Sequence, residues 1–128
     1  SYLHPLKDDL ILGVGEEDGQ VKLSLFDVSD PSDPTERDKF SLEDYWTEVN
    51  SNHHAFMIDQ ENELFFIPGS TNSYVFGYGD NELALEKVFE DVSVKRALYI
   101  DDYFYIVWEE SIEVYEIDGW DKVTKLDY

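Results

Sequence analysis

The sequence predicts an all-β protein built from three four-stranded antiparallel sheets, arranged as blades of a β-propeller. Two observations lead to this prediction. Short apolar or alternating runs, broken by Gly, Pro, Asn and Asp, recur along the chain, whereas helical periodicity is scarce. The same four-strand pattern also occurs three times, at the spacing of roughly 40 to 50 residues that is typical of propeller blades. An antiparallel sandwich is the second choice, and the repeat favours blades.

The three blades are expected over about residues 1–40, 53–91 and 94–128 of a single propeller-type domain, 1–128. The first strands are short, apolar and end in acidic turns: residues 5–6, 55–58 and 97–100. The second strands are strongly hydrophobic, as suits strands packed on both faces: 10–14, 64–67 and 103–108. The third strands alternate and carry Phe26, Phe76 and Tyr115 at matching places: 21–28, 74–78 and 112–117. The fourth strands are more polar, as suits an outer strand: 36–40, 83–89 and 123–126.

The segment "SLEDYWTEVNSN", residues 41–52, interrupts this rhythm. Ser41 followed by Asp44 resembles a capping box, and the apolar residues Leu42, Tyr45, Trp46 and Val49 have helical spacing. The pattern predicts one short helix here, in the connection between the first two blades. Such connections lie on the propeller face where ligands usually bind.

Three blades are too few to close a ring, because propellers close with about 4 to 8 blades. The chain begins "SYLHPLKDDL", without Met, which we interpret as an excised or processed piece. We therefore expect either contacts with further blades of a longer protein or a homodimer that closes a ring of six.

Composition restricts the partners. The 128 residues include 30 Asp and Glu against 9 Lys and Arg, a net charge of −21. This charge repels phosphate groups, which argues against nucleic acid and membrane-surface binding. It also fits a protein from a saline environment. The chain has no cysteine, so disulfides and thiolate metal sites are excluded, and no apolar stretch is long enough to cross a bilayer.

Four segments resemble a known family: "SYLHPLKDDLILGVG", "VKLSLFDVSDPSDPTERDKFSL", "HHAFMIDQENELFFIP" and "RALYIDDYFYIVWEESIEVYEID". Together they are similar to the C-terminal part of an uncharacterised β-propeller family of secreted or membrane-anchored archaeal and bacterial proteins. The resemblance implies a propeller fold and an extracellular or cell-envelope setting. It implies no activity and transfers no catalytic residue.

A metal site is one hypothesis. His4, His54 and Arg96 each stand near the start of a first strand, which would place them at one mouth of the propeller channel. Two imidazoles and a carboxylate from Asp44 or Glu48 could bind Zn²⁺ or another divalent cation. Arg96 would repel such a cation, however. In the alternative interpretation, these side chains only satisfy loop backbone groups.

Two other motifs are interpreted as turns. Asp27, Asp30 and Asp33 in "DVSDPSDP" lack the alternating ligands of a calcium loop, and Asp and Ser ahead of Pro are typical of turns. "GVGEEDGQ" lacks the Lys and the following helix of a phosphate-binding loop, so Asp18–Gly19 is expected to form a hairpin turn.

No catalytic triad or paired-carboxylate site can be derived from the sequence, and no cofactor is expected beyond a divalent cation. The sequence therefore favours a non-catalytic binding or interaction module over its alternative, a metal-dependent enzyme. Tyr45, Trp46 and Arg96 are the candidate ligand-binding residues for a protein or glycan partner. Trp108 and Trp120 would support such a role if they shared an exposed surface.

Overall fold

The computed structural model describes residues 2–45, 56–68, 72–90, 96–107 and 110–127, and every regular element in these residues is a β-strand. Blade 1 consists of β1 (Tyr2–Lys7), β2 (Leu10–Glu17), β3 (Gln20–Asp27) and β4 (Thr35–Tyr45). Blade 2 consists of β5 (Met57–Asp59), β6 (Leu64–Pro68), β7 (Ser73–Gly77) and β8 (Ala84–Phe89). Blade 3 consists of β9 (Arg96–Ile100), β10 (Tyr103–Val107), β11 (Ser111–Glu116) and β12 (Lys122–Asp127).

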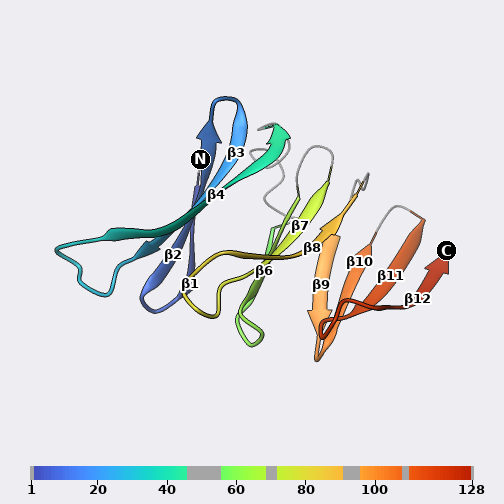
Figure 1. Ribbon diagram of the computed structural model, residues 1–128. Helices are drawn as coiled ribbons and strands as arrows, with labels where there is room; N and C mark the ends of the chain where they lie inside the picture. The colour runs from blue at the N-terminus through green and yellow to red at the C-terminus, as the bar shows by residue number, and fades with distance from the viewer. Residues whose placement is uncertain (1, 46–55, 69–71, 91–95, 108–109, 128) are drawn as a thin grey trace.

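The three blades lie side by side in chain order, as Figure 1 shows. Within each blade the strands are antiparallel and adjacent in the order in which they occur along the chain. The prediction of an all-β chain with three four-stranded antiparallel sheets is thereby confirmed. In the described part of the chain, no helix is long and apolar enough to cross a membrane.

The repeat seen in the sequence is also a repeat of backbone geometry. Phe26, Phe76 and Tyr115, which align in the sequence, occupy the same register position on the third strands, opposite Ile11, Phe65 and Phe104. At this position the pairing with the fourth strand slips by one residue in all three blades. A bulge of this kind bends the strand and increases the local twist. The blades therefore share their irregularities as well as their strand order.

One hydrogen bond outside the ladders also occurs three times. The amide just beyond the third strand donates to the carbonyl just before the second strand. The pairs are Val28 to Asp9, Tyr78 to Glu63 and Ile117 to Asp102, at 2.9, 3.0 and 2.9 Å. These bonds close the same end of each blade, because they satisfy backbone groups that the strand ladder leaves unpaired.

Burial follows the predicted gradient from inner to outer strands. All five residues of β6 and all five of β7 are buried, whereas all six residues of β12 are exposed. Strands packed on both faces become uniformly hydrophobic, which is why "LFFIP" and "SYVFG" suit the middle of the central blade.

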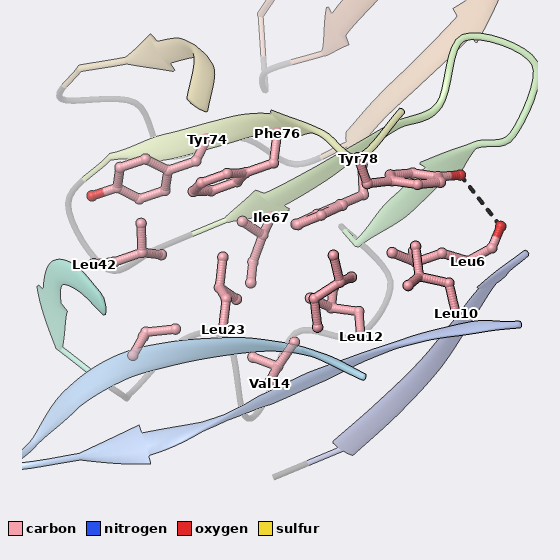
Figure 2. Close-up of a cluster of buried hydrophobic side chains, with 13 residues drawn as sticks. Leu6, Leu10, Leu12, Val14, Leu23, Leu42, Ile67, Tyr74, Phe76 and Tyr78 are labelled. Atoms are coloured by element: carbon pink, nitrogen blue, oxygen red, sulfur yellow. Dashed lines mark hydrogen bonds between the residues drawn. The ribbon is translucent and has the colours of Figure 1, made fainter. Parts of the chain in front are cut away.

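The core consists of two layers, one between each pair of neighbouring blades. Between blades 1 and 2, leucine and valine side chains of β2 and β3 face the aromatic side chains of β6 and β7 (Figure 2). In this layer the Tyr78 hydroxyl donates to the Leu6 carbonyl at 3.3 Å, drawn as the dashed line. Between blades 2 and 3, Phe66 and Phe89 pack against Phe104, and Phe89 also meets Tyr115 edge to face. Neighbouring blades are therefore held together by the apolar side chains on the sheet faces that they turn towards each other.

The predicted helix at residues 41–52 is wrong where the structure describes this segment. Residues 41–45 continue β4, with Ser41 opposite Lys22 and Tyr45 opposite Gln20. Leu42 is 2% exposed and packs into the layer between blades 1 and 2, and Phe40 packs against that layer. Phe40 and Leu42 are two residues apart and both face the core, which is the periodicity of a β-strand. Their packing outweighs the cap-like spacing of Ser41 and Asp44. Residues 46–52 lie outside the described residues.

Candidate binding groove

His4, the first of the proposed metal ligands, lies on β1 opposite Leu12. Its ring stacks on the ring of Phe56 from blade 2, with ring centroids 4.0 Å apart and planes 13° apart. The imidazole is half-buried, and this contact places it as a packing group between two blades.

The other proposed site residues are not placed by the structure. His54, Trp46 and Trp108 lie outside the described residues. The backbones of Asp44 and Tyr45 end β4, and that of Arg96 begins β9, but their side chains are outside the described part. Among the side chains that are described, no group of three His, Cys, Asp or Glu could hold a metal ion. The metal and ligand-binding assignments for these residues stay predictions.

The aspartates of "DVSDPSDP" form turns, as predicted. Asp27 accepts hydrogen bonds from the Ser29 amide and hydroxyl at 2.9 and 2.7 Å, and Asp30 accepts the same pair from Ser32 at 3.0 and 2.7 Å. These bonds stabilise the ionised carboxylates and hold the pKa of both below the usual value. Their carboxylates stabilise the turn locally.

The Asp18–Gly19 hairpin is also confirmed. Glu17 pairs with Gln20, and both residues between them have positive φ, 55° for Asp18 and 80° for Gly19. Two successive positive φ angles define the turn type that matches the twist of a two-residue hairpin.

One hollow in the described structure lies between blades 2 and 3, at the end of the blades where first strands turn into second strands. It has a volume of about 670 Å³. Three turns and one outer strand contribute its lining: Asn62, Leu64, Glu86, Asp102, Tyr103, Glu116, Ile117, Asp118, Gly119 and Trp120. We call it the acidic groove. Volumes of this size are typical of ligand sites.

Trp120 supplies the groove with a fixed aromatic surface. Its indole meets the Phe104 ring edge to face, with centroids 5.5 Å apart, so it is anchored on the core between blades 2 and 3. The backbone at Trp120 has a positive φ of 60°, directly after Gly119 at 87°. Non-glycine residues seldom adopt this conformation, so the packing on Phe104 must hold the turn in place. The Trp120 side chain itself stays half-exposed.

Acidic residues complete the lining: Glu86, Asp102, Glu116 and Asp118, all of which are exposed. Glu86 lies over the backbone of Gly77, where its Oε1 would be 2.8 Å from a Cβ atom added at that glycine. A side chain at position 77 would push this carboxylate aside. None of the described lining residues is basic, so the groove has a negative potential in a chain that is itself strongly acidic.

The matching position between blades 1 and 2 is different, because a basic residue partly neutralises it. A hollow of about 440 Å³ is lined there by Lys7, Glu63 and Tyr78, among others. Lys7 Nζ lies 2.9 Å from Glu63 Oε2 and 5.8 Å from the centre of the Tyr78 ring. Burial, together with the charges of Glu63 and Asp59, raises the pKa of Tyr78 to about 12. The acidic groove therefore differs from this second hollow in that no Lys or Arg is among its lining residues.

Sequence reasoning missed the acidic groove. In the sequence, Asp101 and Asp102 stand out only as the acidic turn that follows the first strand of blade 3. The useful signal was the repeat itself. It places the turns after first and third strands at one end of the molecule, so that "IDD" and "IDGW" must lie next to each other.

A family model described as "Beta propeller domain" matches residues 1–119. An uncharacterized protein of Archaeoglobus fulgidus is 49% identical over 98% of the chain, and one of Methanocaldococcus jannaschii is 35% identical over 100% of it. The chain spans only 20% and 21% of the length of these two proteins. A solved structure titled "AfRom2 CNH domain" aligns with 92% of this chain and 50% of its own, at 8% identity and a TM-score of 0.37, too low to add to the argument.

Proposed function

Because this chain belongs to the family of beta propeller domains, we propose that it is a non-catalytic binding module that takes up a basic segment of a partner protein in the acidic groove. The observation that carries this proposal is the composition of the groove, where Trp120 lies among the acidic residues Glu86, Asp102 and Asp118 and no lining residue is basic. The partner is a protein segment that carries Lys or Arg.

Both kinds of lining group favour a cation. Carboxylates accept charge-assisted hydrogen bonds from Lys and Arg, and Arg can engage one carboxylate with two parallel bonds. The face of an indole or phenol ring attracts a cation through its quadrupole, by about 0.5 to 1 kcal/mol at an exposed site. The net charge of −21 adds long-range attraction, which increases the association rate for a basic ligand.

The test is a titration of the purified chain with short peptides that alternate Lys or Arg with Gly and Ser, followed by tryptophan fluorescence and calorimetry. The double variant Asp102→Asn, Asp118→Asn should bind about 2- to 30-fold more weakly, because two exposed charge contacts contribute roughly 0.4 to 2 kcal/mol together. The double variant Asp33→Asn, Glu36→Gln is the matched control. It removes the same net charge from exposed carboxylates on blade 1, outside the groove, and should bind like the natural chain.

Equal weakening in both double variants would show that the peptide responds to net charge alone, which would refute a site in the groove. Saturable binding of a neutral oligosaccharide in place of the basic peptide would also refute the proposal, because it would assign the Trp120 surface to a glycan.

A further inference from the structure

Lys7 shows how this molecule binds an ammonium group between two of its own blades. Its Nζ atom lies 2.9 Å from Glu63 Oε2 of blade 2 and 5.8 Å from the centre of the Tyr78 ring. The contact is open to solvent, since the side chain of Lys7 is 38% exposed and that of Glu63 is 42% exposed. We call the Glu63 carboxylate together with the Tyr78 ring the ammonium site. It combines a charged acceptor with an aromatic face, and both stabilise a cation.

The position of the carboxylate in this site repeats in blade 3. Glu63 directly precedes the second strand of blade 2, and its carbonyl accepts a hydrogen bond from the Tyr78 amide at 3.0 Å. Asp102 directly precedes the second strand of blade 3, and its carbonyl accepts the same bond from the Ile117 amide at 2.9 Å. Asp102 therefore has the place at the junction of blades 2 and 3 that Glu63 has at the junction of blades 1 and 2.

The residue that supplies the ammonium group does not repeat. Lys7 ends the first strand of blade 1 and pairs with Leu10. Its register equivalent in blade 2 is Asp59, which ends β5 and pairs with Leu64. Asp59 is 1% exposed and accepts hydrogen bonds from the amide and the side-chain nitrogen of Asn62, at 3.1 and 2.8 Å. Blade 2 therefore has a carboxylate where blade 1 has a lysine, and this carboxylate is satisfied within its own turn.

Asp102 consequently lacks an internal ammonium partner. Among the described side chains, the residues that form ion pairs through their ammonium groups are Lys7, Lys22, Lys122 and Lys125, and none of them pairs with Asp102. Asp102 lines the acidic groove, and so does Trp120 from the loop between the third and fourth strands of the same blade. The groove thus offers the same two kinds of group as the ammonium site, without a lysine of the chain.

The origin of the acidic residues favours an ammonium over a guanidinium group. Asp102, Asp118 and Glu86 come from three separate segments: two connections of blade 3 and the outer strand of blade 2. A lysine ammonium has three donors that rotate, so it can bond to acceptors on different segments. A guanidinium is planar, and its best contact is a pair of parallel bonds to one carboxylate. Single carboxylates on separate segments therefore suit lysine better.

We propose that the basic residue recognised by the acidic groove is a lysine, whose ammonium group pairs with Asp102 as that of Lys7 pairs with Glu63. This inference rests on the proposed function and narrows its ligand from a Lys- or Arg-bearing segment to a lysine side chain. The ammonium site is then a second site of the same class, which Lys7 fills from within the chain. An external lysine enters it only when Lys7 is removed, because an intramolecular group has the higher effective concentration.

The first test compares peptides of equal length in which Gly and Ser alternate with Lys or with Arg. Isotope-labelled rings report the two sites separately, Trp120 for the acidic groove and Tyr78 for the ammonium site. In the natural chain, the Lys peptide should shift the Trp120 resonance only, and it should bind about 2- to 5-fold more tightly than the Arg peptide. Trimethyllysine keeps the charge but has no N–H donor, so a peptide that carries it should bind more weakly than the Lys peptide.

The variant Lys7→Gln tests the equivalence of the two sites. Titration of this variant with the Lys peptide should shift the Tyr78 resonance as well, because the ammonium site is then vacant. Lys39→Gln is the matched control, since it changes the net charge equally at an exposed residue of β4 that lines neither hollow. Its Tyr78 resonance should stay in place during the titration. Unchanged circular dichroism would show that both variants fold.

The outcomes separate this inference from the proposed function. An Arg or trimethyllysine peptide that binds at least as tightly as the Lys peptide would overturn the pairing of a lysine with Asp102, and a basic-segment site in the groove would still stand. A Tyr78 resonance that stays in place in Lys7→Gln would overturn the equivalence of the two sites. Absence of any Trp120 shift with all three peptides would refute the proposed function, and this inference with it.

Discussion

At the residue scale, Tyr78 connects the two halves of the blade 1–blade 2 layer. Its ring is completely buried among core side chains, while its hydroxyl reaches the Leu6 carbonyl at 3.3 Å. Burial first, and then the charges of Glu63 and Asp59, disfavour the phenolate and raise the pKa of Tyr78 to about 12, from an ordinary value of 10.0. The folded chain therefore holds the Tyr78 proton more tightly than the unfolded chain does.

This difference predicts a loss of stability at alkaline pH. Below about pH 10, Tyr78 is protonated in both states and its contribution is complete. As the pH rises from about 10 towards 12, the unfolded phenol ionises first, so the free energy of unfolding falls. Tyr78→Phe removes the ionisable group. Thermal melts of both proteins should be recorded between about pH 8 and 12. The melting temperature of the variant should rise relative to that of the natural chain only above about pH 10. A constant difference across this range would contradict the assigned environment of Tyr78.

At the element scale, the first half of β4 could be predicted from the sequence and the second half could not. Its polar first half, "TERDKF", was predicted as an outer strand and is one. Its second half fits two periods equally well, since Leu42 belongs both to an alternating pair with Phe40 and to a helical set with Tyr45. Local spacing could not decide between them. The packing of Leu42 against blade 2 decides, and it depends on residues distant in the sequence.

The inner strands could be predicted because their composition leaves little choice. Runs such as "LFFIP" must be buried on both faces, and the three copies of the pattern align them. The bulges at Phe26, Phe76 and Tyr115 could not be predicted, because they arise from strand twist rather than from a residue type. The acidic groove was missed for a related reason. Its acidic residues lie in ordinary turns and strands, and they acquire a role only when two blades bring them together near Trp120.

Leu42→Ala tests the strand assignment of residues 41–45. Leu42 is 2% exposed, so truncation should leave a cavity between blades 1 and 2 and lower the free energy of unfolding by about 2 to 5 kcal/mol. Leu85 lies on an outer strand and is 42% exposed, so Leu85→Ala should lower the free energy of unfolding by well below half of the loss expected for Leu42→Ala. Urea unfolding followed by circular dichroism measures both. Equal, small losses would mean that Leu42 points to solvent and that β4 ends before it.

At the scale of the whole molecule, the chain is a series of blades in which each contributes half of a core layer to the next. Aromatic contacts mark both junctions. Phe40 of blade 1 meets Phe76 of blade 2, and Phe89 of blade 2 meets Tyr115 of blade 3, each pair edge to face with ring centroids 5.1 Å apart. The acidic groove between blades 2 and 3 has its present form only if this stacking holds.

The measurement that tests this stacking most directly is a nuclear Overhauser spectrum of the chain with isotope-labelled Phe and Tyr rings. Cross-peaks between Phe40 and Phe76 and between Phe89 and Tyr115 are predicted, because protons of rings 5.1 Å apart lie within range. The contact of Phe65 with Phe76, at 5.3 Å within blade 2, provides the internal reference. All three cross-peaks are expected for the stacked blades. A spectrum that contains the reference peak but neither of the peaks between blades would contradict it.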